Sequence, residues 1–306
     1  ITYGVLVAFV SYTIQFFEPV REIARIFAEL QMAHAAAERV MGLLNTEPEI
    51  QDRPGLSDKC PHLQGAVEFE NVSFAYNPLE PVLEDFNLKV KPGQTVALVG
   101  ETGSGKSTIV NLACRFYEPT KGRVLIDGVD YRDRPLSWLQ RNLGYVLQSP
   151  HLFSGNIREN IRYGNLKASD AEVEQAARLV NAHDFIVNLP QGYDSEVGEG
   201  GGLLSTGQKQ LISFARAVLA DPKIFVLDEA TSSIDTETEM LIQDAIKTVL
   251  EGRTSFIIAH RLSTVRSADV ILVIRDGKVQ EKGNHTELMA AKGYYYRLYT
   301  NQFLEG

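Results

Sequence analysis

The pattern of hydrophobic and polar positions divides the chain into a long helical segment and a mixed region that follows it. Residues 1–17 carry no charged side chain, and Glu18 is the first ionisable residue. From residue 20 to residue 44 hydrophobic side chains recur at steps of three and four, with charged residues on the remaining faces. This spacing predicts a continuous helix. The proline-containing residues 45–64 end the pattern and predict a linker.

The apolar residues 1–17 are the length of most of a membrane span. A transmembrane helix needs about 20 mostly apolar residues to cross a hydrocarbon layer of about 30 Å. We therefore interpret residues 1–44 as the cytoplasmic-side portion of a span, cut at its beginning, that leaves the membrane and enters an aqueous region. A buried core helix is the alternative, and it is disfavoured because nothing precedes it to pack against.

The mixed region alternates strand and helix patterns. Residues 66–76 alternate and are rich in aromatic and β-branched side chains, which predicts a strand. Residues 94–100 and 224–227 are nearly continuous apolar runs, as in strands that are buried on both faces. Residues 270–290 predict a hairpin that turns at Asp276-Gly277 and is followed by a C-terminal helix.

Composition excludes several classes of protein. The 306 residues are 44% hydrophobic and 23% charged, which is ordinary for a globular chain. The net charge of −9 argues against a nucleic-acid partner, since such a partner is held by neutralising its phosphates. The two cysteines, Cys60 and Cys114, are too few for a disulfide framework or a zinc site and suit a reducing compartment.

The strand at residues 94–100 leads into a phosphate-binding loop. Residues 100–107 match the pattern G-x-x-x-x-G-K-[ST], in which glycines let backbone N–H groups curl around phosphates at the start of a helix. Lys106 would neutralise the β- and γ-phosphates, and the Ser107 hydroxyl would bind Mg²⁺. An accidental lysine in a glycine-rich turn is disfavoured by the strand before it and the helix after it. The candidate ATP-binding residues are Gly100, Thr102, Gly103, Ser104, Gly105, Lys106, Ser107 and Thr108.

Two acidic residues follow the apolar run at residues 224–227. Asp228 would hold Mg²⁺, through water, and Glu229 would orient or deprotonate the attacking water as a general base. Acidic residues at a strand end can also cap the next helix. The phosphate loop in the same chain favours the catalytic interpretation.

These motifs resemble the nucleotide-binding domain of an ATP-binding cassette (ABC) exporter, preceded by the end of its last transmembrane helix. The resemblance covers essentially all 306 residues. It implies that Tyr76 in "FAYNP" stacks on adenine and that Gln148 in "YVLQSP" contacts Mg²⁺ and senses the transmembrane domain. It also implies that His260 in "IIAHRLST" bonds the γ-phosphate. Asp235 ends "SSID", which resembles the D-loop that communicates between subunits.

The stretch "LSTGQ", residues 204–208, resembles the ABC signature. In the family two nucleotide-binding domains pair head to tail, so that Ser205, Gly207 and Gln208 would bind the partner's ATP in trans. Position 206 is threonine where the family has glycine. Two interpretations stay open: identical chains form two working sites, which we favour, or this chain pairs with a different one and one site is weakened.

The resemblance implies an α/β fold with a P-loop NTPase (ABC ATPase) core. An antiparallel β subdomain around residues 65–90 would hold Tyr76, and an α-helical signature subdomain would span about residues 149–215. The expected divisions are a transmembrane end at residues 1–44, a linker at 45–64 and the nucleotide-binding domain at 65–306.

The expected function is ATP hydrolysis with Mg²⁺ that drives export of a drug, lipid or peptide across the plasma membrane, with the domain on its cytoplasmic side. The expected partners are a second nucleotide-binding domain, the chain's own transmembrane domain and membrane, and the exported substrate. A soluble ABC ATPase of DNA repair or translation is disfavoured by the apolar residues 1–17 and the acidic charge. A non-hydrolysing regulatory module is disfavoured because Glu229 and His260 are both present.

Overall fold

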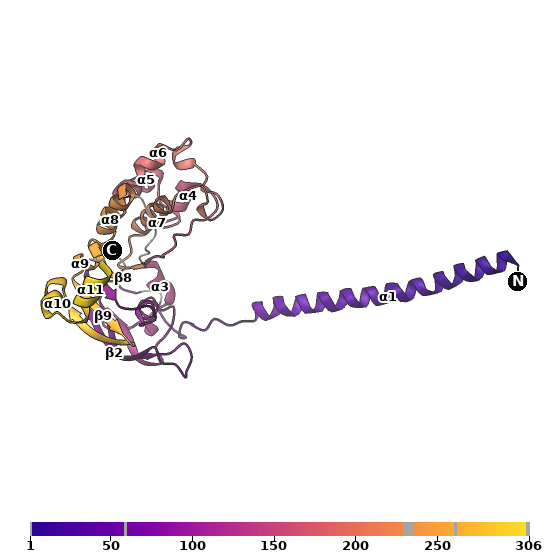
Figure 1. Ribbon diagram of the computed structural model, residues 1–306, viewed down its shortest axis with the longest axis horizontal. Helices are drawn as coiled ribbons and strands as arrows, with labels where there is room; N and C mark the ends of the chain where they lie inside the picture. Colours follow the sequence, from indigo (N-terminus) through magenta and orange to yellow (C-terminus); the bar gives the residue numbers. More distant parts are fainter. Residues whose placement is uncertain (1, 58–59, 229–235, 260–261, 304–306) are drawn as a thin grey trace. The chain divides into compact units, whose positions relative to one another are not determined.

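The structure, a computed structural model, describes residues 2–57, 60–228, 236–259 and 262–303 of the chain (Figure 1). It forms two compact units, Ile1–Gln51 and Asp52–Gly306.

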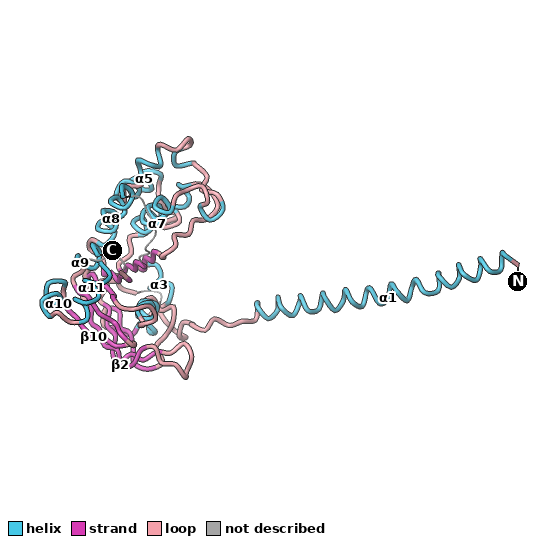
Figure 2. The backbone as a smooth tube through the Cα atoms, viewed as in Figure 1, coloured by secondary structure: helices cyan, strands magenta, loops and turns pink. Residues whose placement is uncertain are grey.

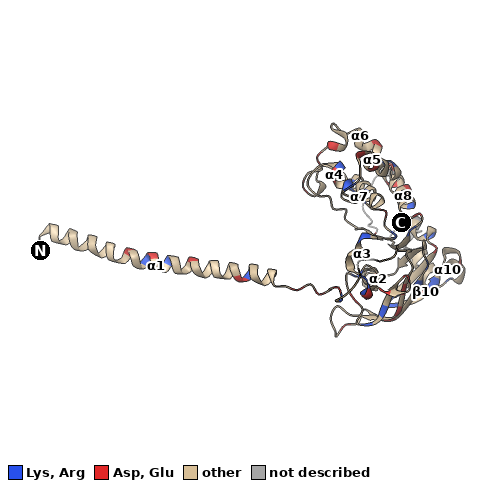
Figure 3. Ribbon diagram, turned by 180° about the vertical axis from the view of Figure 1, so that it is seen from behind, with Lys and Arg blue, Asp and Glu red and all other residues tan. Residues whose placement is uncertain are grey.

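The first unit consists chiefly of one helix, α1 (Tyr3–Leu44), of 42 residues. It continues through Pro19 without a break, as the tube in Figure 2 shows, and none of its residues is buried. Its first turns carry no charged side chain, and the charges begin part-way along it (Figure 3). Among the described residues, α1 is the one helix long and apolar enough to cross a membrane.

The second unit contains a six-stranded sheet with the strand order β10-β9-β3-β8-β7-β6. Its strands are β3 (Thr95–Val99), β6 (Leu143–Val146), β7 (Ile224–Asp228), β8 (Thr254–Ile258), β9 (Val270–Arg275) and β10 (Lys278–Gly283). All pairs are parallel except β9 with β10, which form a hairpin with its turn at Asp276 and Gly277. The carboxyl ends of the parallel strands therefore share one edge, where ligands bind in folds of this kind.

A second sheet is antiparallel, with the order β2-β1-β4-β5. Its strands are β1 (Val67–Phe74), β2 (Leu83–Val90), β4 (Lys121–Ile126) and β5 (Val129–Asp130). The two sheets confirm the predicted fold class. The antiparallel sheet extends beyond residues 65–90, because β4 pairs with β1. The first three residues of β4 are exposed and its last three buried, so it has no alternating pattern to reveal it.

Helices contact the six-stranded sheet. The helices of the second unit are α2 (Lys106–Ala113), α3 (Leu136–Arg141), α4 (Ile157–Arg162), α5 (Asp170–Leu179), α6 (His183–Val187), α7 (Thr206–Ala220), α8 (Thr236–Leu250), α9 (Leu262–Ser267), α10 (His285–Ala291) and α11 (Tyr294–Phe303). Short 3₁₀ turns lie at Tyr131–Asp133, Gly192–Asp194 and Glu199–Gly201. Figure 1 shows α4–α8 gathered in one group and α10 and α11 beside the strands.

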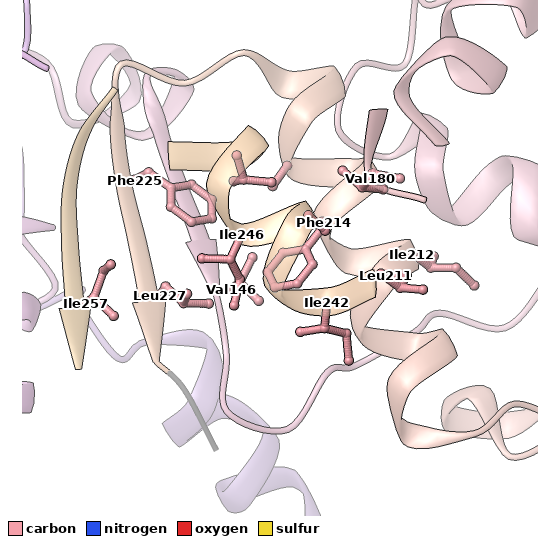
Figure 4. Packing of buried hydrophobic residues seen from close by; sticks show 14 of the residues in the cluster. Val146, Val180, Leu211, Ile212, Phe214, Phe225, Leu227, Ile242, Ile246 and Ile257 are labelled. Atoms are coloured by element: carbon pink, nitrogen blue, oxygen red, sulfur yellow. The ribbon is translucent and has the colours of Figure 1, made fainter. Parts of the chain in front are cut away.

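The six-stranded sheet packs on α7 and α8 through one hydrophobic cluster. Figure 4 shows Phe214 of α7 next to Ile242 and Ile246 of α8, with Phe225 and Leu227 of β7 projecting toward them. Each of these five side chains is almost completely removed from water. Burial of side chains of this size contributes about 1.5–3 kcal/mol each, so this cluster holds the helical group on the sheet.

A second hydrophobic cluster covers the opposite face of the same sheet. Val96 and Leu98 of β3 lie in it, whereas the alternate residues Ala97 and Val99 lie in the first cluster. Successive side chains of a strand point to opposite faces, so β3 is packed on both sides. Ile109 of α2 belongs to the second cluster as well. The loop between β3 and α2 is therefore held at both of its ends.

Part of the segment before β1 is tied to the second unit. The Asp52 carboxylate accepts a hydrogen bond of 2.8 Å from Leu136 N, at the start of α3, and lies 3.5 Å from the Arg115 guanidinium. The Trp138 indole N–H donates to Pro61 O at 3.1 Å. These contacts fix Asp52 against α3 and the end of α2, and Pro61 against α3.

Arg115, which lies two residues after α2, is among the largest fully buried side chains of the described residues. Its guanidinium donates to Glu118 at 2.9 Å and to the carbonyl oxygens of Tyr131 and Arg134 at 3.2 and 3.1 Å. A buried guanidinium is stable only when its donors find such acceptors. Arg115 thus joins three separate segments.

The two cysteines are expected to differ in reactivity. Cys114 is fully buried and burial raises the pKa of its thiol, whereas Cys60 is partly exposed. Since the thiolate is the reactive form, a disulfide reagent should titrate one thiol in the native protein and two after denaturation. Cys60→Ser should remove the fast thiol. Equal native rates for both cysteines would contradict this burial.

Candidate ATP-binding site

The loop that follows β3 has a backbone that only glycine allows at its first position. Gly100 has φ +154°, and a Cβ there would lie 2.2 Å from the carbonyl oxygen of Ile274 in β9. Gly105 has φ +103° and precedes the first residue of α2. The loop thus runs directly into a helix N-terminus, where unpaired N–H groups and the helix dipole favour an anion.

Lys106 is the buried cation of this loop. Its side chain is 8% exposed, and Nζ donates to the carbonyl oxygens of Gly100 and Glu101 at 2.8 and 2.7 Å. Burial lowers the pKa of Lys106, while the charge of Asp228 acts in the opposite direction. Lys106 and Asp228 therefore interact electrostatically, although Lys106 begins α2 and Asp228 ends β7, far along the sequence.

The remaining loop residues divide into exposed and buried positions. Thr102, Gly103 and Ser107 are exposed to solvent, whereas Ser104 and Thr108 are buried. The buried Ser104 Oγ has no hydrogen-bond partner among the described residues. The exposed positions give a ligand access to the loop backbone and to the Ser107 hydroxyl.

Tyr76 lies beside the same helix. Its hydroxyl is 3.3 Å from Thr108 Oγ1, and Asn111 Nδ2 donates to it at 3.4 Å. The ring meets those of Phe74 and Tyr117 edge to face, with centroids 4.8 and 5.0 Å apart, and about half of the side chain is exposed. The contacts place an aromatic ring next to α2. The sequence did not reveal Asn111, because nothing but the fold brings this helical amide to Tyr76.

Gln148 and Asp228 follow neighbouring strands of the six-stranded sheet. Asp228 is partly buried at the end of β7, and Gln148 is exposed, two residues after β6. These strands pair in parallel, so both residues lie at the edge of the sheet from which the phosphate loop emerges. Glu229, Asp235 and His260 lie outside the described residues.

The side chains available for a cation at this edge are oxygen donors. Ser107 offers a hydroxyl, Gln148 an amide oxygen and Asp228 a carboxylate. Mg²⁺ prefers such ligands and is usually bound by one or two carboxylates together with phosphates and water. No group of three or more His, Cys, Asp or Glu residues that could hold a metal occurs in the described part of the chain. The donor set fits Mg²⁺ that is shared with a nucleotide.

The signature stretch forms the start of α7. Ser205 caps the helix: its Oγ accepts from Gln208 N at 3.2 Å, and Gln208 Oε1 accepts from Ser205 N at 3.0 Å. Ser205 and Thr206 are exposed, whereas Gly207 is buried. The capping role of Gln208 was not inferred from the sequence, although Ser-x-x-Gln is the pattern of a capping box.

The candidate residues thus fall into two sets. One set lies along the strands and α2, and it consists of the phosphate loop, Tyr76, Gln148 and Asp228. The other set lies at the start of α7, among helices α4–α8, and it consists of Ser205, Gly207 and Gln208. Figure 3 shows α7 together with α4–α6, and α2 beside the strands.

Fold and site together define a class of protein. The phosphate loop with its buried Lys106 follows β3, a parallel strand that is buried on both faces, and Asp228 ends β7 of the same sheet. P-loop nucleotide-binding ATPases have this arrangement. A helical group with its own capped helix start and a separate antiparallel sheet accompany this core.

Comparison with known proteins narrows the class. Residues 83–232 match the family described as ABC transporter. The chain is 49% identical over 298 residues to a fatty acid ABC transporter ATP-binding/permease protein of Mycobacterium bovis, covering 97% of this chain and 47% of that protein. It is 46% identical over 304 residues to an ATP-dependent lipid A-core flippase of Syntrophus aciditrophicus, covering 99% and 50%. The structure of a bacterial Atm1-family ABC exporter with ATP bound has a TM-score of 0.81 and 39% identity, and the match covers 99% of this chain and 53% of that one.

The chain belongs to the ABC transporter family, and it is similar to the ATP-binding part of a solved ABC exporter. As a catalytic domain it is an ABC-type ATPase. The resemblance stated from the sequence is confirmed. The chain spans about half the length of the curated relatives that it matches.

Proposed function

We propose that this chain is the ATP-hydrolysing part of a membrane exporter and that it works as one half of a head-to-tail pair. The observation that carries the proposal is the separation of its two phosphate-directed elements. The phosphate loop lies between β3 and α2, and the exposed, capped start of α7 lies in the helical group. A head-to-tail pair gives each loop the partner's α7.

In the proposed site, Tyr76 stacks on the adenine ring and the loop of residues 100–108 surrounds the phosphates. Lys106 exchanges its two carbonyl acceptors for phosphate oxygens. Ser107 and Gln148 would hold Mg²⁺ directly, and Asp228 would hold it through water. Mg²⁺ bound there would supply positive charge beside the phosphates.

Hydrolysis requires residues outside the described ranges. We assign the general base to Glu229, which takes a proton from water as that water attacks the γ-phosphorus and the bond to the β-phosphate oxygen breaks. His260 donates a hydrogen bond to the γ-phosphate, and Asp235 communicates between the paired domains. These three assignments rest on the motifs.

The start of α7 contacts the partner's nucleotide in this arrangement. The Ser205 hydroxyl, the Gly207 N–H and the Gln208 side chain approach the γ-phosphate, where the helix dipole favours negative charge. Thr206 is exposed, so its side chain meets the partner. We propose that the pair is formed by two identical chains. A pair with a different chain is the alternative.

The long apolar helix supports a membrane role. We propose that residues 1–44 end the transmembrane domain, that residues 45–64 link it to the ATPase and that residues 65–306 form the nucleotide-binding domain on the cytoplasmic side of the plasma membrane. ATP binding closes the pair and hydrolysis reopens it, which switches the membrane domain between inward and outward access. The relatives named for lipid A-core, fatty acids and multidrug resistance favour a lipid or another hydrophobic amphiphile as cargo over a peptide.

The proposal is tested by asking whether this chain hydrolyses ATP without a different partner chain. The specific ATPase activity of the full chain in detergent should rise with protein concentration, because two chains are needed for one complete site. Glu229→Gln should remove the activity while ATP still binds. Activity that stays at the Glu229→Gln level at every concentration, with ATP bound, would contradict the identical pair and favour a different partner chain.

A further inference from the structure

A hydrogen bond joins the C-terminal helix to the phosphate loop. The Tyr294 hydroxyl, on the first residue of α11, donates to Glu101 Oε1 at 2.7 Å across 193 positions of sequence. Glu101 directly follows Gly100, and it is exposed. Neither residue has a role in the proposed chemistry.

The Tyr294 side chain and backbone are held in place by residues of the sheet and of α11. The guanidinium groups of Arg275 and Arg297 lie over its ring, 5.4 and 5.8 Å from the centroid. The Glu281 carboxylate of β10 accepts from the backbone N–H groups of Tyr294 and Tyr295 and so ties the start of α11 to the sheet. The Tyr294 hydroxyl therefore has a fixed position from which to bind Glu101.

Glu101 lies in the phosphate loop, so its negative charge affects the binding of an anionic ligand there. Its carbonyl oxygen accepts the hydrogen bond from Lys106 Nζ, so its backbone is part of the phosphate loop itself. Its carboxylate is a negative charge on a loop whose ligand carries several negative charges. Two like charges a few ångströms apart at a protein surface repel each other.

We propose that Tyr294 is a positioning residue for nucleotide binding, and that it holds the Glu101 carboxylate against α11 and away from the phosphates of ATP. The two arginines beside the Tyr294 ring add a positive field on the same side. This role rests on the proposed binding of ATP at the phosphate loop. It makes the C-terminal helix a determinant of ATP affinity.

The test measures the dissociation constant of MgATP for the full chain in detergent by titration calorimetry. Tyr294→Phe removes only the hydroxyl, keeps the ring that Arg275 and Arg297 contact, and should weaken ATP binding about threefold to tenfold. Tyr296→Phe makes the same chemical change two residues further along α11 and should leave the constant unchanged.

Combining Tyr294→Phe with Glu101→Gln distinguishes an effect on the position of the Glu101 charge from a general loosening of α11. With the charge removed, Tyr294→Phe should have no effect on ATP affinity. The weakening in the wild-type background should shrink at high salt, because ions screen an exposed charge. A helix that is merely loosened would weaken binding equally in both backgrounds and at every ionic strength.

The outcomes are distinct. An unchanged constant in Tyr294→Phe, or equal weakening with Glu101 and with Gln at position 101, would overturn the positioning role. Equal ATP affinity of the wild type and of Lys106→Ala would instead contradict nucleotide binding at this loop. The two failures are therefore separable.

Discussion

Lys106→Ala is expected to lower ATP turnover at least about a hundredfold and to weaken ATP binding. In the described part of the chain the buried Nζ donates to two carbonyl oxygens, and phosphate oxygens can take the place of these acceptors. Loss of one preorganised donor to developing charge commonly costs a factor of about 100 to 1,000 in rate. The measurement is steady-state phosphate release at saturating MgATP, together with the dissociation constant.

Lys89→Ala is the matched control for this change. Lys89 is an exposed lysine of β2 that pairs with Glu68 at 2.9 Å. Removing it deletes the same side chain and charge from a site without a role in catalysis, and turnover should be unchanged. Wild-type turnover in Lys106→Ala would show that the loop is not the phosphate site.

Arg115→Ala is expected to lower the free energy of unfolding strongly. It removes the guanidinium that donates to the Glu118 carboxylate and to the carbonyl oxygens of Tyr131 and Arg134. Breaking a buried charged network in this way costs about 3–5 kcal/mol. For a domain of this size that corresponds to a fall of roughly 6–20 °C in the melting temperature, measured by thermal unfolding of the full chain.

Arg123→Ala tests whether burial is the cause. Arg123 pairs with Glu70 through its guanidinium, as Arg115 does with Glu118, but its side chain is 57% exposed against 1% for Arg115. An exposed pair of this kind contributes less than about 1 kcal/mol, so Arg123→Ala should lower the melting temperature by only a few degrees. Similar losses in both variants would show that the Arg115 network contributes little.

Much of the fold could be predicted because its signals are local in sequence. The apolar run at residues 94–100 predicts the strand that is observed as β3 (Thr95–Val99), since a strand buried on both faces needs side chains of that kind at every position. The glycines of the phosphate loop and the turn at Asp276-Gly277 are recognisable for the same reason: their backbone conformations restrict the residue type.

What the sequence could not reveal depends on contacts between distant segments. Arg115 gives no periodic signal, and its burial depends on acceptors from two distant segments, the carbonyl groups of Tyr131 and Arg134 and the carboxylate of Asp52. The bond from Tyr294 to Glu101 joins residues that are 193 positions apart in the sequence. Strand β4 is half exposed and was missed as a partner of β1, because its pairing depends on backbone hydrogen bonds, which carry no side-chain pattern.

The capping box at Ser205 has a consequence for the timing of pair formation. The Oγ atom accepts the hydrogen bond from Gln208 N, so the hydroxyl keeps its proton free for an outside acceptor. The side chain already has one rotamer in the single chain. When a second chain brings a γ-phosphate to this helix, little rotational freedom remains to be lost there. In the proposed pair, Ser205 can therefore bind the γ-phosphate as soon as the two chains meet. The step that limits the rate of pair formation is then not the ordering of this side chain.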